Sequence, residues 1–191
     1  MKIEQHPLEP FLPANARLLM LGSFPPQRKR WIMEFYYPNW NNDMWRIVGL
    51  IFFGDKEHFV VKGKRAFSKD ELIAFLQEKG IALYDTATAV RRLQDNASDK
   101  FLEVVQPTDV RALLEKLSQC RAIVTTGEKA TDTLCRTFAL TAPKVGDFTE
   151  FVFEGRPMRL YRMPSSSRAY PLALDKKAAA YRVMYQDLQM L

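Results

Sequence analysis

The segment from residue 27 to residue 45 combines basic, aromatic and amide side chains at a density that ordinary helices and strands do not carry. It begins with three consecutive cations, Arg28, Lys29 and Arg30. Its second half reads Phe35-Tyr36-Tyr37-Pro38-Asn39-Trp40-Asn41-Asn42-Asp43-Met44-Trp45. Aromatic rings stack on flat heterocycles, amides hydrogen-bond to their edges, and cations attract phosphate. The segment therefore suits a flat heteroaromatic ring that is attached to a phosphate backbone.

A buried strand is expected to position this segment. The apolar run 18–21, closed by Gly22, is typical of such a strand, and Pro25-Pro26 stiffens the loop that follows it. A second apolar run, 81–84, delivers Asp85 to the end of another strand. Ligands of α/β proteins bind just beyond the carboxyl ends of the strands, so the loop after Gly22 is expected to lie at a ligand site.

Strands alternate with helices along the rest of the chain. We expect strands at 18–22, 81–84 and 122–126, and a hairpin over 148–153 and 158–163. We expect helices at about 44–54, 68–79, 110–117, 128–138 and 175–190. Ser68 and Glu71 have the spacing of a capping box, whereas residues 1–17 are expected to be extended and 90–99 to form a polar loop. The pattern predicts one α/β domain over residues 1–191. We expect three α/β/α layers and a mainly parallel, four-stranded central sheet, with room for one antiparallel addition.

Composition and net charge limit the kinds of molecule that this protein is expected to bind. The chain has 191 residues, 47% of them hydrophobic, which is enough for a sizeable core. Its net charge of +6 and pI near 9.3 favour an anionic partner, nucleic acid first and an acidic membrane surface second. Two cysteines make neither a disulfide framework nor a metal cluster, so no metal and no cofactor are expected. No apolar run is long enough to span a membrane and no signal peptide is evident, so we expect a cytoplasmic protein.

Two short motifs carry a resemblance to a known family. Residues 22–26, Gly-Ser-Phe-Pro-Pro, and residues 36–45 together resemble the first motif of the uracil-DNA glycosylase superfamily. The likeness is greatest to its hypoxanthine-DNA glycosylase and mismatch-specific uracil-DNA glycosylase branches. The segment 163–168, Met-Pro-Ser-Ser-Ser-Arg, resembles the second motif of that superfamily. The resemblance implies the uracil-DNA glycosylase-like fold and a monomeric hydrolase of base excision repair. Such an enzyme removes uracil or hypoxanthine from damaged or mismatched DNA, double- or single-stranded.

The resemblance also implies roles for particular residues. Asn42 matches the asparagine that holds the attacking water, and Asp43 is the nearest carboxylate, although it could simply cap the next helix. Tyr37 matches the aromatic residue that stacks on the flipped base, beside Phe24 of the first loop. Asp85 lies where relatives place a base-reading side chain, and a carboxylate there would accept from the ring N–H of uracil or hypoxanthine. A turn or helix cap is the alternative role for Asp85.

A further set of residues is expected to bind DNA. The cations Arg28, Lys29 and Arg30 would contact phosphates because of their charge, and the resemblance assigns phosphate contacts to Ser165 and Ser166. Arg168, with Tyr170 as the second choice, would fill the gap that the flipped base leaves in the duplex.

Two departures from the family pattern leave other functions open. The better-known uracil enzymes activate water with Asn or Asp where this chain has Phe24, and they often carry His where it has Ser165 to Ser167. Its own His6 and His58 lie outside both motifs and are expected at the surface. One alternative is therefore a catalytically silent member of the same fold that binds nucleic acid. Another α/β nucleotide enzyme is the weakest alternative, because the sequence contains neither the dinucleotide-binding nor the phosphate-loop glycine motif.

Overall fold

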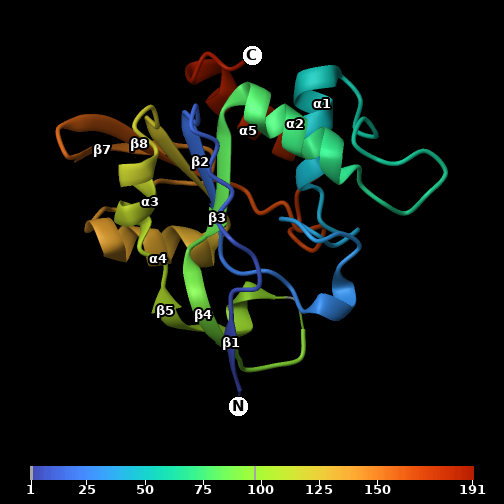
Figure 1. Ribbon diagram of the computed structural model, residues 1–191, viewed down its shortest axis with the longest axis horizontal. Helices are drawn as coiled ribbons and strands as arrows, with labels where there is room; N and C mark the ends of the chain where they lie inside the picture. Colours follow the sequence, from blue (N-terminus) through green and yellow to red (C-terminus); the bar gives the residue numbers. More distant parts are fainter. Residues whose placement is uncertain (1, 97) are drawn as a thin grey trace.

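The computed structural model describes residues 2–96 and 98–191, which form a mixed α/β fold with two sheets and five α-helices (Figure 1). The strands of the larger sheet are β2 (Leu18–Gly22), β3 (Ile81–Asp85), β6 (Ala122–Thr126), β7 (Phe148–Phe153) and β8 (Arg156–Met163). They lie in the order β3-β2-β6-β8-β7, with the first four parallel and β7 antiparallel to β8. The α/β class is confirmed. The sheet has five strands instead of four: four are parallel, and the hairpin supplies β7 as the antiparallel addition for which the prediction left room.

Helices cover both faces of this sheet. They are α1 (Met44–Phe53), α2 (Lys69–Lys79), α3 (Val110–Lys116), α4 (Glu128–Phe138) and α5 (Leu174–Asp187). Helices α1, α2 and α5 lie on one side and α3 and α4 on the other (Figure 1). Every residue of β2, β3 and β6 is buried, which explains why each of these strands begins with an apolar run in the sequence; Asp85 and two threonines occupy the carboxyl ends of β3 and β6.

Several helix ends follow the sequence signals, although α5 ends at Asp187, before the predicted residue 190. Gly54 and Gly80 end α1 and α2 in the left-handed conformation, with φ of +66° and +70°. At the start of α3, the carboxylate of Asp109 accepts a hydrogen bond of 3.1 Å from the Ala112 amide. The predicted capping box of α2 is wrong in detail: Ser68 is the N-cap residue, but in the described structure its side chain makes no capping hydrogen bond.

A second, smaller sheet was not predicted. It contains β1 (Ile3–Gln5), β4 (Ala87–Arg92) and β5 (Leu102–Pro107), antiparallel in the order β1-β4-β5. The extended lead-in and the start of the polar loop are therefore paired strands. Their charged side chains find partners across the sheet: Arg91 pairs with Glu103, and Nε of Arg92 lies 3.0 Å from the Glu4 carboxylate. This pairing lets polar residues form a strand that has no continuous apolar run.

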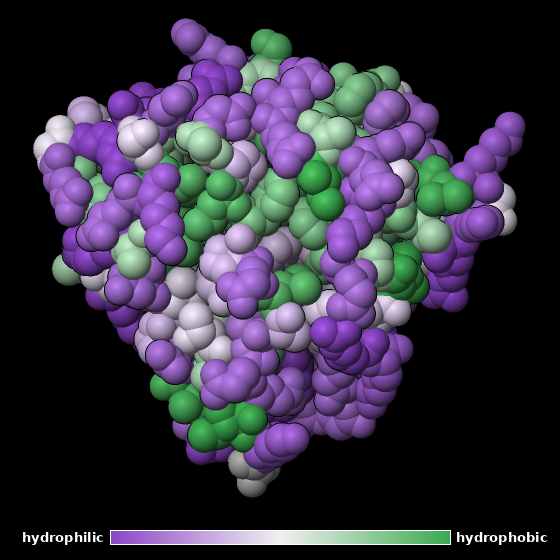
Figure 2. Space-filling view, viewed as in Figure 1, coloured by the Kyte–Doolittle hydropathy of each residue, from purple (hydrophilic) through white to green (hydrophobic). Residues whose placement is uncertain are grey.

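The surface is mostly polar on the face seen in Figure 2, where apolar side chains emerge in small groups between charged ones. Within residues 2–96 and 98–191, no helix combines the length and the apolar character needed to cross a bilayer.

Candidate active site

A cavity of about 1040 Å³ opens at the carboxyl ends of the parallel strands. Its lining includes Gly22 of β2, Asp85 of β3, Thr126 of β6 and Met163 of β8. The chain passes from β2 to β3 on one side and then returns to β6 on the other side of β2. Crevices at such a reversal of strand order are the usual ligand sites of open α/β sheets. This cavity is therefore the candidate active site.

Tyr37 lines the cavity and is held by the end of β6. Its Oη lies 3.0 Å from Oγ1 of Thr126, and its ring packs edge-on against Trp45 with centroids 5.7 Å apart. Its φ of +49° is left-handed, a conformation that costs a non-glycine residue about 1–2 kcal/mol. Burial raises the pKa of Tyr37 far above its ordinary value, so its hydroxyl stays neutral. Tyr37 is thus a fixed, neutral aromatic wall.

The other aromatic residues of the segment have different surroundings. Tyr36 is a core residue with 4% of its surface exposed, and its hydroxyl donates to the Glu9 carbonyl at 2.6 Å. Phe24 lines the cavity, but it also packs in a small apolar cluster with Ala87 and Val90. Phe24 therefore closes one wall of the cavity and brings no polar group to it.

Asp85 projects from the end of β3 into the cavity lining, where Gly22 makes room for it. A Cβ atom on Gly22 would lie only 2.6 Å from Oδ1 of Asp85, so only glycine permits this approach. The other carboxylate oxygen, Oδ2, lies 2.7 Å from Nε2 of His6. The backbone carbonyl of Asp85 accepts a hydrogen bond of 2.6 Å from the Thr108 hydroxyl. Asp85 is thus held at both its backbone and its side chain.

The prediction that His6 is a surface residue is wrong. Its side chain is only 2% exposed, because β1 brings it over the end of β3. The sequence carried no sign of this contact, since its partner Asp85 is 79 residues away. His58 is exposed as predicted, and its ring stacks on Phe53 with centroids 3.6 Å apart.

Asn42 lines the cavity at the start of α1. Its Oδ1 accepts a hydrogen bond of 3.0 Å from the Met44 amide, and its backbone forms an isolated bridge with Ser167. A carbonyl oxygen has a second lone pair, and the amide nitrogen is a donor. The capping bond therefore leaves Asn42 able to hold a water, and its catalytic role stays a prediction.

Asp43 is placed differently from Asn42. It is 7% exposed and does not belong to the lining of the cavity. Its Oδ1 lies 3.2 Å from Nη1 of Arg46 and 2.9 Å from Nη2 of Arg168. Its backbone amide also donates to the Ser166 carbonyl at 2.8 Å. These contacts favour a structural role, in which Asp43 holds the two motifs together.

The second motif follows β8 and is tied to α5. The buried Lys177 donates to the Ser167 carbonyl at 2.7 Å, and the Tyr181 hydroxyl donates to the Pro164 carbonyl at the same distance. Ser165 and Ser166 line the cavity, whereas Arg168 does not, and half of its side chain is exposed. The structure thus brings the predicted serines to the candidate site and places Arg168 at its edge.

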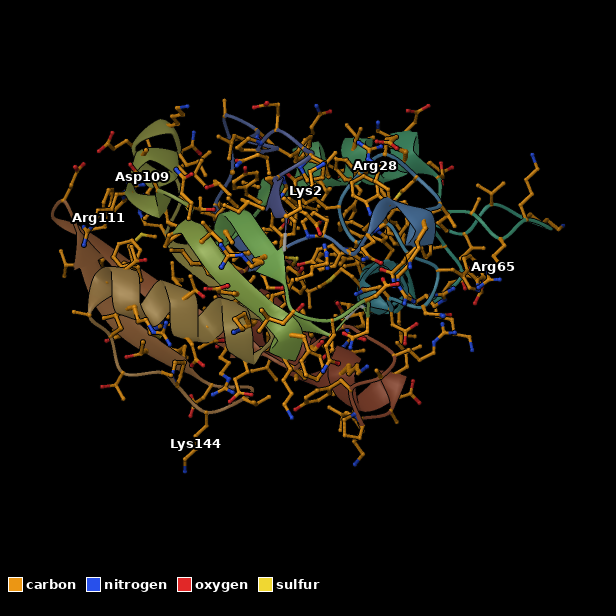
Figure 3. The ribbon with its side chains drawn as sticks, turned by 90° about the horizontal axis from the view of Figure 1, so that it is seen from below. Lys2, Arg28, Arg65, Asp109, Arg111 and Lys144 are labelled. Atoms are coloured by element: carbon orange, nitrogen blue, oxygen red, sulfur yellow. The ribbon has the colours of Figure 1, made fainter. Side chains whose placement is uncertain are left out.

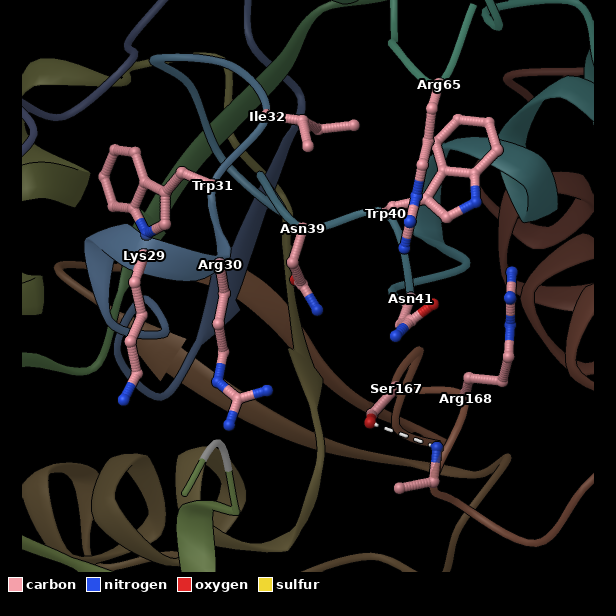
Figure 4. Close-up of a pocket in the computed structure, with 11 residues that line it drawn as sticks. Lys29, Arg30, Trp31, Ile32, Asn39, Trp40, Asn41, Arg65, Ser167 and Arg168 are labelled. Carbon is pink, nitrogen blue, oxygen red and sulfur yellow. Dashed lines mark hydrogen bonds between the residues drawn. The ribbon is translucent and has the colours of Figure 1, made fainter. Parts of the chain in front are cut away.

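A second, cationic groove of about 710 Å³ adjoins the cavity (Figure 4). Lys29, Arg30 and Trp31 line one side of it, and Trp40, Arg65 and Arg168 line the other. The two hollows share lining residues Asn39, Ser167 and Ala169. Of the predicted DNA-binding cations, only Arg28 is absent from the two linings: it pairs with Glu34 and lies over the Trp31 ring. Figure 3 shows Arg28 and Arg65 toward one end of the molecule and Asp109 and Arg111 toward the other.

Sequence reasoning missed several residues of the cavity. Asp99 enters the lining from a short 3-10 helix, Asp99–Phe101, between β4 and β5, where the sequence predicts a polar loop. Desolvation raises the pKa of Asp99, the Ser23 hydroxyl lowers it, and the charge of Asp85 raises it further. Lys129 and Arg92 also belong to the lining. Among the residues that the structure describes, no group of three or more His, Cys, Asp or Glu side chains is arranged to hold a metal ion.

Comparison with known proteins identifies the fold. No protein-family model and no curated protein matches the chain. Among solved structures, it is similar to the solution NMR structure of a "putative Uracil DNA glycosylase" from Methanosarcina acetivorans. The TM-score is 0.66 and the sequence identity 21%, over 98% of this chain and 99% of that one. This chain therefore has the fold of that archaeal protein.

Proposed function

We propose that the protein is a DNA glycosylase that hydrolyses the N-glycosidic bond of a deaminated base, uracil or hypoxanthine, flipped out of DNA. One observation carries the proposal: a single cavity at the strand ends holds a carboxylate, a neutral phenol and an amide, and it adjoins a cationic groove. The likeness of fold to the Methanosarcina protein supports it. The resemblance of both motifs to the uracil-DNA glycosylase superfamily also supports it, and the choice of uracil or hypoxanthine as substrate depends on that resemblance.

The cavity suits a flat base. Tyr37 would stack on the ring, a contact that contributes about 1–3 kcal/mol per base. Phe24 would form another, apolar part of the wall. Oδ1 of Asp85 would accept a hydrogen bond from the ring N–H of uracil or hypoxanthine. Cytosine and adenine present an acceptor at the corresponding ring position, so an ionised Asp85 would disfavour them.

Asn42 would supply the catalytic step by holding a water. During hydrolysis the water oxygen bonds to C1′ of the sugar while the bond from C1′ to the base nitrogen breaks. The base leaves with the bonding electrons, and the proton released by the water passes through solvent to the base. A neutral amide cannot take that proton, so the contribution of Asn42 is orientation.

The DNA backbone would lie in the groove, next to the cavity that takes the flipped base. Arg30 and Arg65 would contact phosphates next to the flipped nucleotide, and Ser165 and Ser166 would contact phosphates at the mouth of the cavity. Arg168 would enter the duplex at the vacated position.

The alternative function is a catalytically silent protein that binds damaged or single-stranded nucleic acid. The packed ring of Phe24 favours it, because the first loop brings no water-activating group to the cavity.

A panel of duplexes that contain uracil, hypoxanthine, xanthine or mismatched thymine would test the proposal. We expect alkali-labile sites at uracil or hypoxanthine and none in the unmodified duplex. Salt-dependent binding of every duplex without cleavage would contradict glycosylase activity and favour the silent protein. Absence of both binding and cleavage would contradict both functions.

A further inference from the structure

His6 is a feature of the candidate site that neither motif accounts for. Its imidazole is 2% exposed and lies against the aromatic rings that surround the strand ends. The ring centroid is 4.5 Å from that of Tyr84 and 5.2 Å from that of Phe24, which it meets edge-on. A histidine packed this closely beside a cavity has a fixed ring plane.

The contacts of His6 determine which of its ring nitrogens donates a hydrogen bond to Asp85. Nε2 lies 2.7 Å from Oδ2 of Asp85, and an ionised carboxylate can only accept, so Nε2 carries a proton. Nδ1 lies 3.1 Å from the backbone nitrogen of Leu8 and 2.9 Å from its carbonyl oxygen. Neutral His6 would accept from that amide, and protonated His6 would donate to that carbonyl. Nε2 donates to Asp85 in either state.

The segment that carries His6 is anchored independently of this bond. The His6 amide donates to the Thr88 carbonyl at 2.8 Å, and Gln5 pairs with Ala89 across β1 and β4. Arg92, which pairs with Glu4, also donates to the Pro25 carbonyl at 2.6 Å. The small sheet therefore ties His6 to the loop of the first motif.

We propose that His6 is a positioning residue for base selection: its Nε2–H holds Oδ2 of Asp85 away from the base, and a single acceptor, Oδ1, faces the cavity. Uracil and hypoxanthine carry a carbonyl oxygen beside the ring N–H. Without His6, the carboxylate would be free to turn and present its second oxygen to that carbonyl, which repels it. The inference rests on the proposed glycosylase function and assigns to His6 the orientation of the carboxylate that recognises the base.

Three variants test this role. His6→Ala removes the donor, His6→Gln replaces it with an amide N–H that can reach Oδ2, and Leu8→Ala trims the same segment without removing the donor. For each variant, the single-turnover excision rate at saturating enzyme would be measured on uracil and on hypoxanthine duplexes. Affinity for a duplex that contains non-cleavable 2′-fluoro-2′-deoxyuridine and the melting temperature would be measured in parallel.

We expect His6→Ala to lower the excision rate roughly 10–100-fold, as loss of a supporting hydrogen bond commonly does. Overall DNA affinity should change little. His6→Gln should recover part of the rate, and Leu8→Ala should keep it even if the melting temperature falls. Equal losses in His6→Ala and Leu8→Ala, or no rescue by Gln, would overturn the inference in favour of simple anchoring. Full activity of His6→Ala would also overturn it while leaving the glycosylase proposal intact. An inactive wild-type protein would overturn the glycosylase proposal and, with it, the assigned role.

Discussion

Arg168 and Asp43, 125 residues apart in the sequence, meet in an ion pair with Nη2 2.9 Å from Oδ1. Two backbone hydrogen bonds accompany it: the Asp43 amide donates to Ser166 at 2.8 Å, and the Arg168 amide donates to Asn41 at 3.0 Å. The loop before α1 and the loop after β8 are thus a single connected wall. If Arg168 is to enter a duplex, as proposed, it must first leave Asp43.

Asp43→Ala is expected to destabilise the fold far more than Arg168→Ala. Arg46 is 5% exposed and would lose its carboxylate partner, and an unpaired buried charge costs about 3–5 kcal/mol. Arg168 is half exposed, and loss of such a pair costs under about 1 kcal/mol. Urea unfolding of both variants measures the difference. Nη1 of Arg46 also donates to the Trp40 and Asn42 carbonyls, and equal and small losses would show that these two bonds alone satisfy Arg46.

Arg168→Ala is expected to impair excision from duplex DNA more than from single strands. A base in a duplex must be unpaired and unstacked at a cost of a few kcal/mol, whereas a single strand has no pairing to oppose. If Arg168 offsets about 1.4 kcal/mol of that cost, the duplex rate alone falls about tenfold. Tyr170 is the second candidate for this role, so the rates of Tyr170→Ala on both substrates are measured for comparison. Equal losses on the two substrates would show that Arg168 does not fill the gap that the flipped base leaves in a duplex.

Asn42→Ala is expected to lower turnover by roughly 10²–10³-fold with little change in DNA affinity. The same change removes the oxygen that accepts a hydrogen bond from the Met44 amide at the start of α1, and loss of such a bond costs about 1 kcal/mol of stability. Asn42→Ser separates the two effects, because serine can cap the helix but is too short to hold the same water. We expect Ser to restore stability and not turnover. Recovery of turnover by Ser would show that only the cap matters.

The cations that line the groove are expected to determine the salt dependence of DNA binding. Replacing Arg30 or Arg65 by Ala should reduce the slope of log K against log salt by about 0.9 for each phosphate that is no longer neutralised. Lys144, exposed and outside both hollows, is the control, and Lys144→Ala should leave the slope unchanged. Binding titrations from low to moderate salt measure this. A slope that responds to Lys144 and not to Arg65 would place the DNA elsewhere.

Asp99 should make the folded protein less stable as the pH rises. Desolvation raises its pKa above the ordinary value of 3.8, so between the two pKa values the folded protein holds a proton that the unfolded chain has released. Stability therefore falls as the pH rises through that window, and Asp99 has no such effect below it. Asp99→Asn should remove this part of the pH dependence, as followed by urea unfolding. Asp147→Asn, at an exposed position outside the cavity, should leave it unchanged.

The sequence predicted the parts of the fold that are buried on all sides. β2 and β6 begin with apolar runs and are buried throughout, and α1 ends at a glycine, so their local signals agree with their final environment. β4 was missed because its two arginines are satisfied by glutamates on neighbouring strands. The contact between His6 and Asp85 was missed for the same reason: its energy comes from a partner that is remote in the sequence, and no local pattern encodes it.

The close approach of Asp85 to Gly22 links these two positions in any attempt to redesign the cavity. A methyl group at residue 22 would lie only 2.6 Å from Oδ1, so Gly22→Ala is expected to displace the carboxylate while Asp85 is present. The same methyl group would be tolerated beside a shorter residue at position 85, and the freed space would admit a differently shaped base. Libraries that vary one of the two positions would therefore find few active proteins. New substrate preferences should emerge when both positions are varied together.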